Sequence, residues 1–489
     1  MEHDIYITIT HFLNYGIFFY SVSIIFAYLF LAVNSVLIIR HYLRRNKTVY
    51  YDDILRSPLA PRISILAPAF NEGRSIVENI RSLLSLHYNN YEIIIINDGS
   101  KDDSIERMVT AYDLYPSQDV MCSDLPHKPI KNIYRSHNPA FKKLIVIDKE
   151  NGGKSDALNA GINLSRADLV ACVDVDCVIE DDALLRMVKP FLEVRGYKMI
   201  ATGGVVRIAN DCVVQQGRIL EVKLPKKALP LFQTLEYIRA FLLGRMAWSR
   251  LNGLLIISGA FGLFDRKVVV EAGGYDTKTV GEDMELVVRM RKLMHKQKIR
   301  YKVEYIPDPL CWTEAPESVN MLVKQRNRWT RGTIETLRSH KDMFFNPRYG
   351  VLGMLSYPFW FFYEWLAPII EFTGLVYFGV LAWLGWINWP HFWLLVALVY
   401  SFSVMYSWLA ILMEETTFRE YDKTGYLVKL LLVAMVEPLF YHPITVYAAI
   451  QGNIDKFIRR KKTWGTQQRK GFNQPEEAAT GQSNSAGAG

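Results

Sequence analysis

The sequence predicts an α/β domain set between membrane-associated helices, and three observations lead to this fold class. Short apolar runs typical of buried strands alternate with helical patterns from Pro61 to about His340. Long uncharged apolar runs lie before and after this region. Polar, glycine-rich motifs directly follow several of the short runs, where ligands bind in sheets of parallel strands.

Composition narrows the class of protein. Half of the 489 residues are hydrophobic and 13% are aromatic, which excludes a disordered chain. The net charge of +8 would suit nucleic-acid binding, but much of the basic excess lies beside apolar runs, at residues 40–47 and 459–462. Membrane lipids explain such flanks better, so we expect no nucleic acid as a partner. Five cysteines without a Cys-x-x-Cys pair predict reduced thiols.

The first long apolar run, Gly16–Ile39, predicts a transmembrane helix. It carries no charge and is long enough to cross a hydrocarbon core of ~30 Å. A cleavable signal peptide is the alternative, but the basic cluster follows the run instead of preceding it. This flank predicts an external N-terminus at residues 1–15, a juxtamembrane linker at 40–60 and a domain on the cytoplasmic side of the plasma (inner) membrane.

The region after Arg348 becomes apolar again. Residues 372–413 contain no Asp, Glu, Lys or Arg and are interrupted at Asn388–His391, which predicts a helical hairpin with a short external turn. Residues 426–450 contain Glu437-Pro438 and His442-Pro443, so we expect a broken, interfacial or re-entrant segment. The chain is thus divided into a soluble domain at 61–345, interfacial and transmembrane helices at 346–455, and a basic, then disordered, cytoplasmic tail at 456–489.

Four apolar runs predict buried strands of a largely parallel sheet, with helices between them. A polar stretch at residues 113–143 is expected to form a surface loop. The predicted strands are residues 63–66, 93–96, 144–147 and 169–173, and two of the helices are residues 75–86 and 154–165. Polar motifs follow these strands at Asn71-Glu72, Asp98, Asn151–Lys154 and Asp174–Asp176.

Asp174-Val175-Asp176 offers two carboxylates at the end of a strand. Both can face one divalent cation held against phosphate oxygens, and Mg²⁺ or Mn²⁺ suits such hard ligands. A solvated turn explains an isolated Asp-x-Asp equally well. The neighbouring strand ends supply the rest of a nucleotide site. There Asp98 can accept hydrogen bonds from a base or ribose, and Lys154 lies at a helix start suited to a diphosphate.

Two further motifs supply a base and a cation. Glu282 and Asp283 follow Gly281 at a predicted helix start, where N-capping is the alternative to catalysis. A carboxylate there can take a proton from an attacking hydroxyl; we favour Asp283, with Glu282 as the alternative. Arg328 supplies a permanent cation and Trp329 a flat face for a sugar ring. A membrane-surface helix is the alternative reading of this second motif.

Together these residues resemble the membrane-embedded family 2 glycosyltransferases, which include cellulose, chitin, hyaluronan and poly-N-acetylglucosamine synthases. The motifs that carry the resemblance are Asp98, Lys154, Asp174–Asp176, Gly281–Asp283 and Gln325–Trp329. The resemblance implies a GT-A, Rossmann-like fold with flanking transmembrane and interfacial helices. It also implies that Asp98, Lys154, Asp174 and Arg328 bind the donor, that Asp174 and Asp176 hold the metal, and that Gln325, Trp329, Ser258 and Gly259 bind the acceptor.

By this resemblance the protein is an inverting, metal-dependent, processive β-glycosyltransferase. It polymerises a sugar from UDP-N-acetylglucosamine or UDP-glucose and passes the polysaccharide across the membrane, with accessory secretion subunits as further partners. Transfer of one sugar to a lipid-linked or short acceptor is the first alternative, and a non-catalytic subunit that binds nucleotide or polymer is the second. Glu364 and Glu371 lie seven residues apart, on one helical face, and we expect this face to border the exit path.

Overall fold

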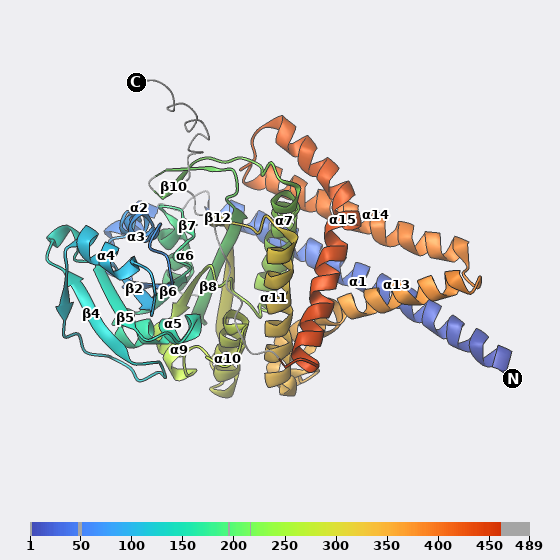
Figure 1. Ribbon diagram of the computed structural model, residues 1–489, viewed down its shortest axis with the longest axis horizontal. Helices are drawn as coiled ribbons and strands as arrows, with labels where there is room; N and C mark the ends of the chain where they lie inside the picture. The colour runs from blue at the N-terminus through green and yellow to red at the C-terminus, as the bar shows by residue number, and fades with distance from the viewer. Residues whose placement is uncertain (1, 47–50, 194–195, 216, 461–489) are drawn as a thin grey trace, which may run out of the picture.

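A ten-stranded mixed sheet forms the centre of the soluble domain (Figure 1). The structure, a computed structural model, describes residues 2–46, 51–193, 196–215 and 217–460. A separate two-stranded hairpin consists of β9 (Val213–Gln215) and β10 (Arg218–Glu221). The strands of the large sheet are β1 (Ile63–Ala69), β2 (Tyr91–Asp98), β3 (Leu114–Ser117), β4 (Ile130–Ser136), β5 (Leu144–Lys149), β6 (Leu169–Val173), β7 (Val178–Ile179), β8 (Lys198–Ile208), β11 (Phe261–Asp265) and β12 (Tyr301–Thr313).

The order of the strands is β3-β4-β5-β2-β1-β6-β11-β8-β12-β7. The four strands β5, β2, β1 and β6 are parallel neighbours, so their carboxyl ends meet at one edge. Their central residues are apolar because helices cover both faces, and in β2 all eight residues are buried. Strand β11 runs antiparallel between β6 and β8 and brings its preceding loop to the same edge.

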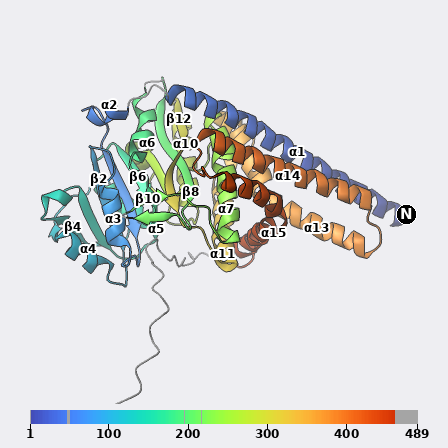
Figure 2. The ribbon, with the colours of Figure 1, turned by 90° about the horizontal axis from the view of Figure 1, so that it is seen from above.

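Helices cover the two faces of this sheet, and the longest of them stand beside the membrane-associated part of the chain (Figure 2). Helices α7 and α11 lie between the sheet and the helices that project from the domain (Figure 1). The helices of the soluble part are α2 (Tyr51–Arg56), α3 (Ile76–Leu84), α4 (Ser104–Tyr112), α5 (Lys154–Leu164), α6 (Ala183–Leu192), α7 (Ala228–Ile238), α8 (Met246–Arg250), α9 (Arg266–Glu271), α10 (Glu282–Lys296) and α11 (Val319–Ser339).

Four helical stretches within the described residues are long and apolar enough to cross a membrane. They belong to α1 (Glu2–Asn46), to the stretch 352–383 that ends in α13 (Ala367–Trp383), to α14 (Trp389–Thr417) and to α15 (Thr424–Phe457). Helices α1, α13 and α14 project together from the domain in both views (Figures 1 and 2). Helix α15 instead runs beside α11 and crosses the projecting helices (Figure 1).

The α/β fold class with flanking apolar helices is confirmed, and three details differ from the expectations. The sheet is mixed, because β11 and the edge strands are antiparallel. Residues 113–143 contain β3 and β4, which extend the sheet. Helix α15 is continuous through Pro438 and Pro443, so the expected break does not occur; neighbouring helices can compensate for the backbone hydrogen bonds that a proline removes. The expected tail beyond residue 460 lies outside the described residues.

A buried ion pair connects the sheet to the projecting helices. Arg207 in β8 donates from Nη2 to the Glu414 carboxylate near the end of α14. Only 2% of the Arg207 side chain and 3% of the Glu414 side chain are exposed, so each charge depends on the other for its stabilisation. This contact fixes where α14 leaves the soluble domain.

We therefore expect Arg207→Met to lower the free energy of unfolding by about 3–5 kcal/mol, because it leaves Glu414 buried without its cation. The thermal unfolding midpoint of the detergent-solubilised protein measures this change. Arg218→Met is the matched control, because Arg218 pairs with Asp181 while 48% of its side chain is exposed; its loss should cost less than about 1 kcal/mol. Equal shifts for the two variants would contradict this account of the junction.

Candidate active site

A single large cavity begins at the carboxyl ends of the parallel strands and continues between the membrane-associated helices. Its volume is about 2050 Å³, which exceeds the roughly 300–1,000 Å³ typical of small-ligand sites. Its far end is lined by residues of α1, α13, α14 and α15. Every site residue predicted from the sequence lines this cavity: Asp98, Lys154, Asp174, Asp176, Ser258, Gly259, Glu282, Asp283, Gln325, Arg328 and Trp329.

Asp98 ends β2 and holds the glycine turn that precedes α5. Its carboxylate accepts hydrogen bonds from Gly152 N at 2.9 Å and from Gly153 N at 2.7 Å. The fully buried Lys149 at the end of β5 donates to Asp98 Oδ1 at 2.7 Å and pairs with Asp156 Oδ1 at 2.5 Å. Asp98 therefore shapes the turn at the mouth of the cavity, and Lys149 is a residue that the sequence analysis did not identify.

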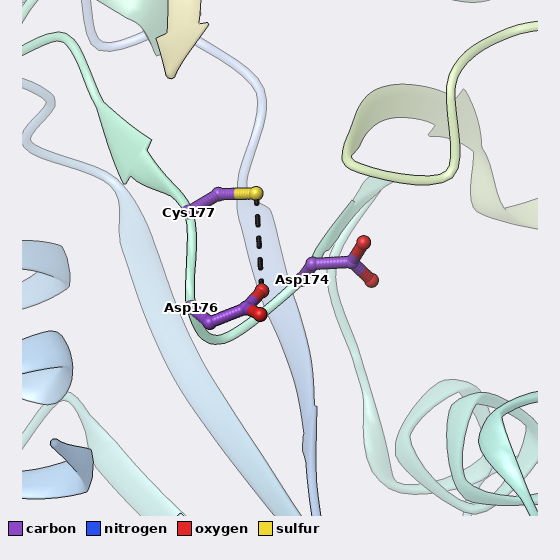
Figure 3. Close-up of side chains that lie close together, drawn as sticks. All are labelled: Asp174, Asp176 and Cys177. Carbon is purple, nitrogen blue, oxygen red and sulfur yellow. Dashed lines mark hydrogen bonds between the residues drawn. The ribbon is translucent and has the colours of Figure 1, made fainter. Parts of the chain in front are cut away.

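Asp174 and Asp176 lie on the turn that follows β6 (Figure 3). Figure 3 shows Cys177 Sγ beside Asp176 Oδ1, at 4.0 Å. One ligand atom from each of Asp174, Asp176 and Cys177 lies within 4.8 Å of the other two. Two carboxylate oxygens so close together match the hard oxygen ligands that Mg²⁺ and Mn²⁺ prefer. The donor set of this turn therefore fits such an ion.

The Lys154 ammonium lies among the carboxylates of the site. Its Nζ forms an ion pair with Asp174 and donates to Gly259 O at 3.0 Å. Burial alone would lower the pKa of Lys154, but the carboxylates of Asp174, Glu282 and Asp283 outweigh burial and raise this pKa. The ammonium thus stays charged, and it lowers the repulsion among three carboxylates that face the same space.

Glu282 and Asp283 open helix α10 but are placed differently. Glu282 is buried, and burial raises its pKa to about 7, with Lys154 opposing the rise. Asp283 is half-buried and accepts a hydrogen bond from Gly259 N at 3.2 Å through Oδ2. Neither side chain forms the cap of α10, whose N-cap is Gly281. Asp283 Oδ1 accepts a hydrogen bond from Met284 N in the first turn of α10 at 2.8 Å, so Asp283 also stabilises the helix start, whereas no capping bond explains Glu282.

Helix α11 approaches the start of α10 without side chains in between. A Cβ atom added to Gly332 would lie 2.7 Å from Gly281 Cα, and one added to Gly281 would lie 2.7 Å from Gly332 Cα. Two residues without Cβ atoms permit this contact, which is closer than any side chain allows. It sets the distance between the acids on α10 and the residues of α11 that line the cavity.

Gln325, Arg328 and Trp329 are the predicted site residues of α11 that line the cavity. Gln325 is buried and lines the cavity, and Trp329 is 41% exposed. The Arg326 guanidinium carbon lies 4.1 Å from the centroid of the Trp329 ring, and Arg326 also pairs with Glu236 Oε2 at 2.6 Å. A stacked arginine fixes the orientation of the indole ring. Arg326 is a second residue that sequence reasoning missed, since its partner Glu236 lies on α7.

Comparison with known proteins gives the class of this site. The model of the family described as "Glycosyl transferase family 2" matches residues 64–119, and that described as "Glycosyltransferase like family 2" matches residues 136–332. The chain belongs to glycosyltransferase family 2. The prediction of a family 2 glycosyltransferase is thereby confirmed, and the matched ranges include Asp98, Asp174, Asp283 and Arg328.

Two similar curated relatives are each named poly-beta-1,6-N-acetyl-D-glucosamine synthase. The one from Staphylococcus epidermidis is 31% identical over 275 residues, which cover 56% of this chain and 55% of the relative. The one from Staphylococcus aureus (strain COL) is 31% identical over 302 residues, which cover 61% and 60% of the two chains. The matched part thus spans little more than half the length of these relatives.

Two solved structures show a more distant similarity. A mannosyltransferase from Pyrobaculum calidifontis, in complex with GDP-Man and Mn²⁺, has a TM-score of 0.47 at 16% identity and covers 86% of this chain and 98% of its own. Residues 1–349 of TarS from S. aureus have a TM-score of 0.36 at 12% identity, covering 78% and 93%. The fold assignment therefore rests on the sheet described above and on the family models.

The contact between Gly281 and Gly332 yields a prediction. We expect Gly332→Ala to lower the rate of sugar transfer by about a hundredfold, because displacement of reacting groups by ~1 Å can cost that much. Gly379→Ala is the matched control, since a Cβ atom at this helical glycine meets no atom within 4 Å. Initial rates of transfer by the two purified variants measure the effect, and a Gly332→Ala rate equal to that of the control would contradict it.

Proposed function

We propose that this protein is a membrane-bound, inverting, metal-dependent polysaccharide synthase. It transfers a sugar from a UDP-sugar to the end of a growing β-linked chain. UDP-N-acetylglucosamine is the preferred donor in this proposal and UDP-glucose the alternative. The names of the two staphylococcal relatives support N-acetylglucosamine.

The continuous cavity is the observation that carries this proposal. It extends from Lys154 and Asp174 to Tyr400 and Phe392 on α14. At about 2050 Å³ it is at least twice the volume of an ordinary small-ligand site, so it has room for several linked sugars besides a nucleotide. A polymer that grew at the acidic end could pass between the helices without leaving the cavity.

The donor end is built to hold a nucleotide diphosphate. Asp98 keeps the Gly152–Gly153 turn in place at the start of α5, where backbone amides and the helix dipole favour anions. Lys154 and Arg328 supply the positive charge that balances the leaving UDP. Asp174 and Asp176 would hold Mg²⁺ or Mn²⁺, and this ion would neutralise the charge that builds up on the diphosphate.

The acceptor end supplies the base. Asp283 accepts the proton of the acceptor hydroxyl while the hydroxyl oxygen forms a bond to the anomeric carbon and the bond from that carbon to UDP breaks. Trp329 offers its ring face to the acceptor sugar, and Gln325, Ser258 and Gly259 line the same part of the cavity. Because attack and departure occur on opposite faces, an α-linked donor yields a β-linked product.

The far end of the cavity is the proposed exit path. Glu364 and Glu371 both line it, and Glu371 Oε2 lies 2.8 Å from His442 Nε2 on α15. Polar groups within apolar helices face a wet interior or one another. We place the soluble domain on the cytoplasmic side of the plasma (inner) membrane, with the basic end of α1 beside it.

Product analysis tests the proposed function. The purified protein in lipid nanodiscs should consume labelled UDP-N-acetylglucosamine with a divalent cation present and release UDP. Its carbohydrate product should be a polymer long enough to be retained by a size-exclusion column. A product extended by one sugar would instead support transfer to a single acceptor. Consumption of no UDP-sugar at all would overturn the enzyme proposal.

Replacement of the proposed base gives a sharper prediction. Asp283→Asn should lower the turnover number by about 10²–10⁴-fold, the usual contribution of a general base. Its affinity for UDP should stay close to that of the wild type, because the amide keeps the shape of the side chain. Glu282→Gln is the matched variant, and turnover by both variants under saturating donor measures the difference. If Glu282→Gln is the more damaging change, Glu282 is the base.

A further inference from the structure

Glu335 on α11 contacts two other parts of the chain at once. Its Oε2 accepts hydrogen bonds from Thr279 Oγ1 at 2.8 Å and from Val280 N at 2.9 Å. Its Oε1 pairs with Lys456 Nζ on α15 at 2.6 Å. The side chain is 15% exposed, so these bonds are shielded from most of the competing water. One carboxylate thus joins a loop of the soluble domain to the end of a membrane-associated helix.

The loop in question leads directly to the proposed base. Thr279 and Val280 immediately precede Gly281, and Gly281 N donates to Thr279 Oγ1 at 3.2 Å. On the other side, Gly281 touches Gly332, which lies one turn before Glu335 on α11. The loop is therefore held at two adjacent points of one helix face. Because α10 begins at the next residue, these points also set where its first carboxylates lie.

The contact with α15 is equally close. A Cβ atom added to Gly452 would lie 3.1 Å from Asn327 O, so the two helices touch through their backbones. Asn327 Nδ2 donates to Asp455 Oδ2 at 3.0 Å, one residue before Lys456. The end of α15 thus lies along α11 at the level of Trp329, and Lys456 extends this contact to Glu335.

We propose that Glu335 is a positioning residue for sugar transfer: it fixes the loop that carries Asp283 and ties that loop, through Lys456, to helix α15. This inference rests on the proposed function. Glu335 touches neither donor nor acceptor, and it acts by holding Asp283 at its working distance from the attacking hydroxyl. Lys456 belongs to α15, which lies beside the proposed exit path. The position of α15 therefore influences the position of the base.

An ordinary surface ion pair would behave differently. Exposed Lys–Glu pairs contribute little to stability and nothing specific to turnover. A positioning residue instead lowers the turnover number while the affinity for the donor stays unchanged, because Glu335 contacts Thr279, Val280 and Lys456, none of which is proposed to bind the donor. The comparison of turnover number with KM for the UDP-sugar therefore separates the two roles.

Four variants of the full-length protein in nanodiscs test the proposal. Glu335→Leu removes both contacts, Glu335→Gln keeps an acceptor for Val280 N but loses the charge, and Lys456→Met removes the tie to α15 alone. Glu317→Leu is the matched control, because Glu317 also pairs with a lysine, Lys227, at 2.5 Å, near the opposite end of α11.

We expect Glu335→Leu to lower the turnover number by about a hundredfold with KM for the UDP-sugar within about twofold of the wild type. Glu335→Gln and Lys456→Met should each lose less than about tenfold, so the amide rescues most of the activity. The control should match the wild type. If the wild type transfers sugar, the proposed function stands. The variants then test the role of Glu335 alone.

Two results would overturn the inference. One is a Glu335→Leu variant whose turnover number equals that of Glu317→Leu. The other is a Glu335→Leu variant in which the turnover number, the donor KM and the thermal midpoint all deteriorate and Glu335→Gln restores none of them, which is the signature of a purely structural residue.

Discussion

The site depends on one interaction above all, the placement of the Lys154 ammonium among three carboxylates. Asp174 follows β6 while Glu282 and Asp283 open α10, and these three carboxylates would repel one another if the cation were absent. Lys154 is held in this position because Asp98 fixes the glycine turn at the start of α5. Asp98 in turn pairs with Lys149. The order of the parallel strands brings these elements to one edge. The acidic groups that we propose for metal, donor and base are thus held together by a cation at the start of a helix.

Helix α11 connects this charged centre to the membrane-associated part of the chain. On one side it touches the start of α10 through Gly281 and Gly332, and on the other it touches α15 through Gly452. Close backbone contacts of this kind leave little freedom for the helices to shift independently. The cavity that starts at Lys154 and ends between α13 and α14 is therefore enclosed by elements that are fixed to one another.

Sequence reasoning found the parts of this fold that local patterns encode. Strands β1, β2, β5 and β6 were predictable because burial on both faces makes their central residues a continuous apolar run, and the motifs at their ends followed from that. Strand β12 was missed because Pro307 and Pro309 interrupt its pattern. Strands β3 and β4 were missed because both are partly polar, at one end of the sheet. Lys149 could have been identified from the sequence, because it is a charged residue at the end of an apolar strand. No sequence pattern identified Arg326 or Glu335, since their partners Glu236 and Lys456 are distant in sequence.

Lys154 is expected to organise the donor side of the site, and the binding of UDP tests this role. Calorimetric titration of UDP into the purified protein with Mn²⁺ should show binding to the wild type. Lys154→Met should weaken this binding at least about tenfold, the effect of losing a charge-assisted contact, while its thermal midpoint shows that it is folded. Equal affinity of the folded variant and the wild type for UDP would contradict the account.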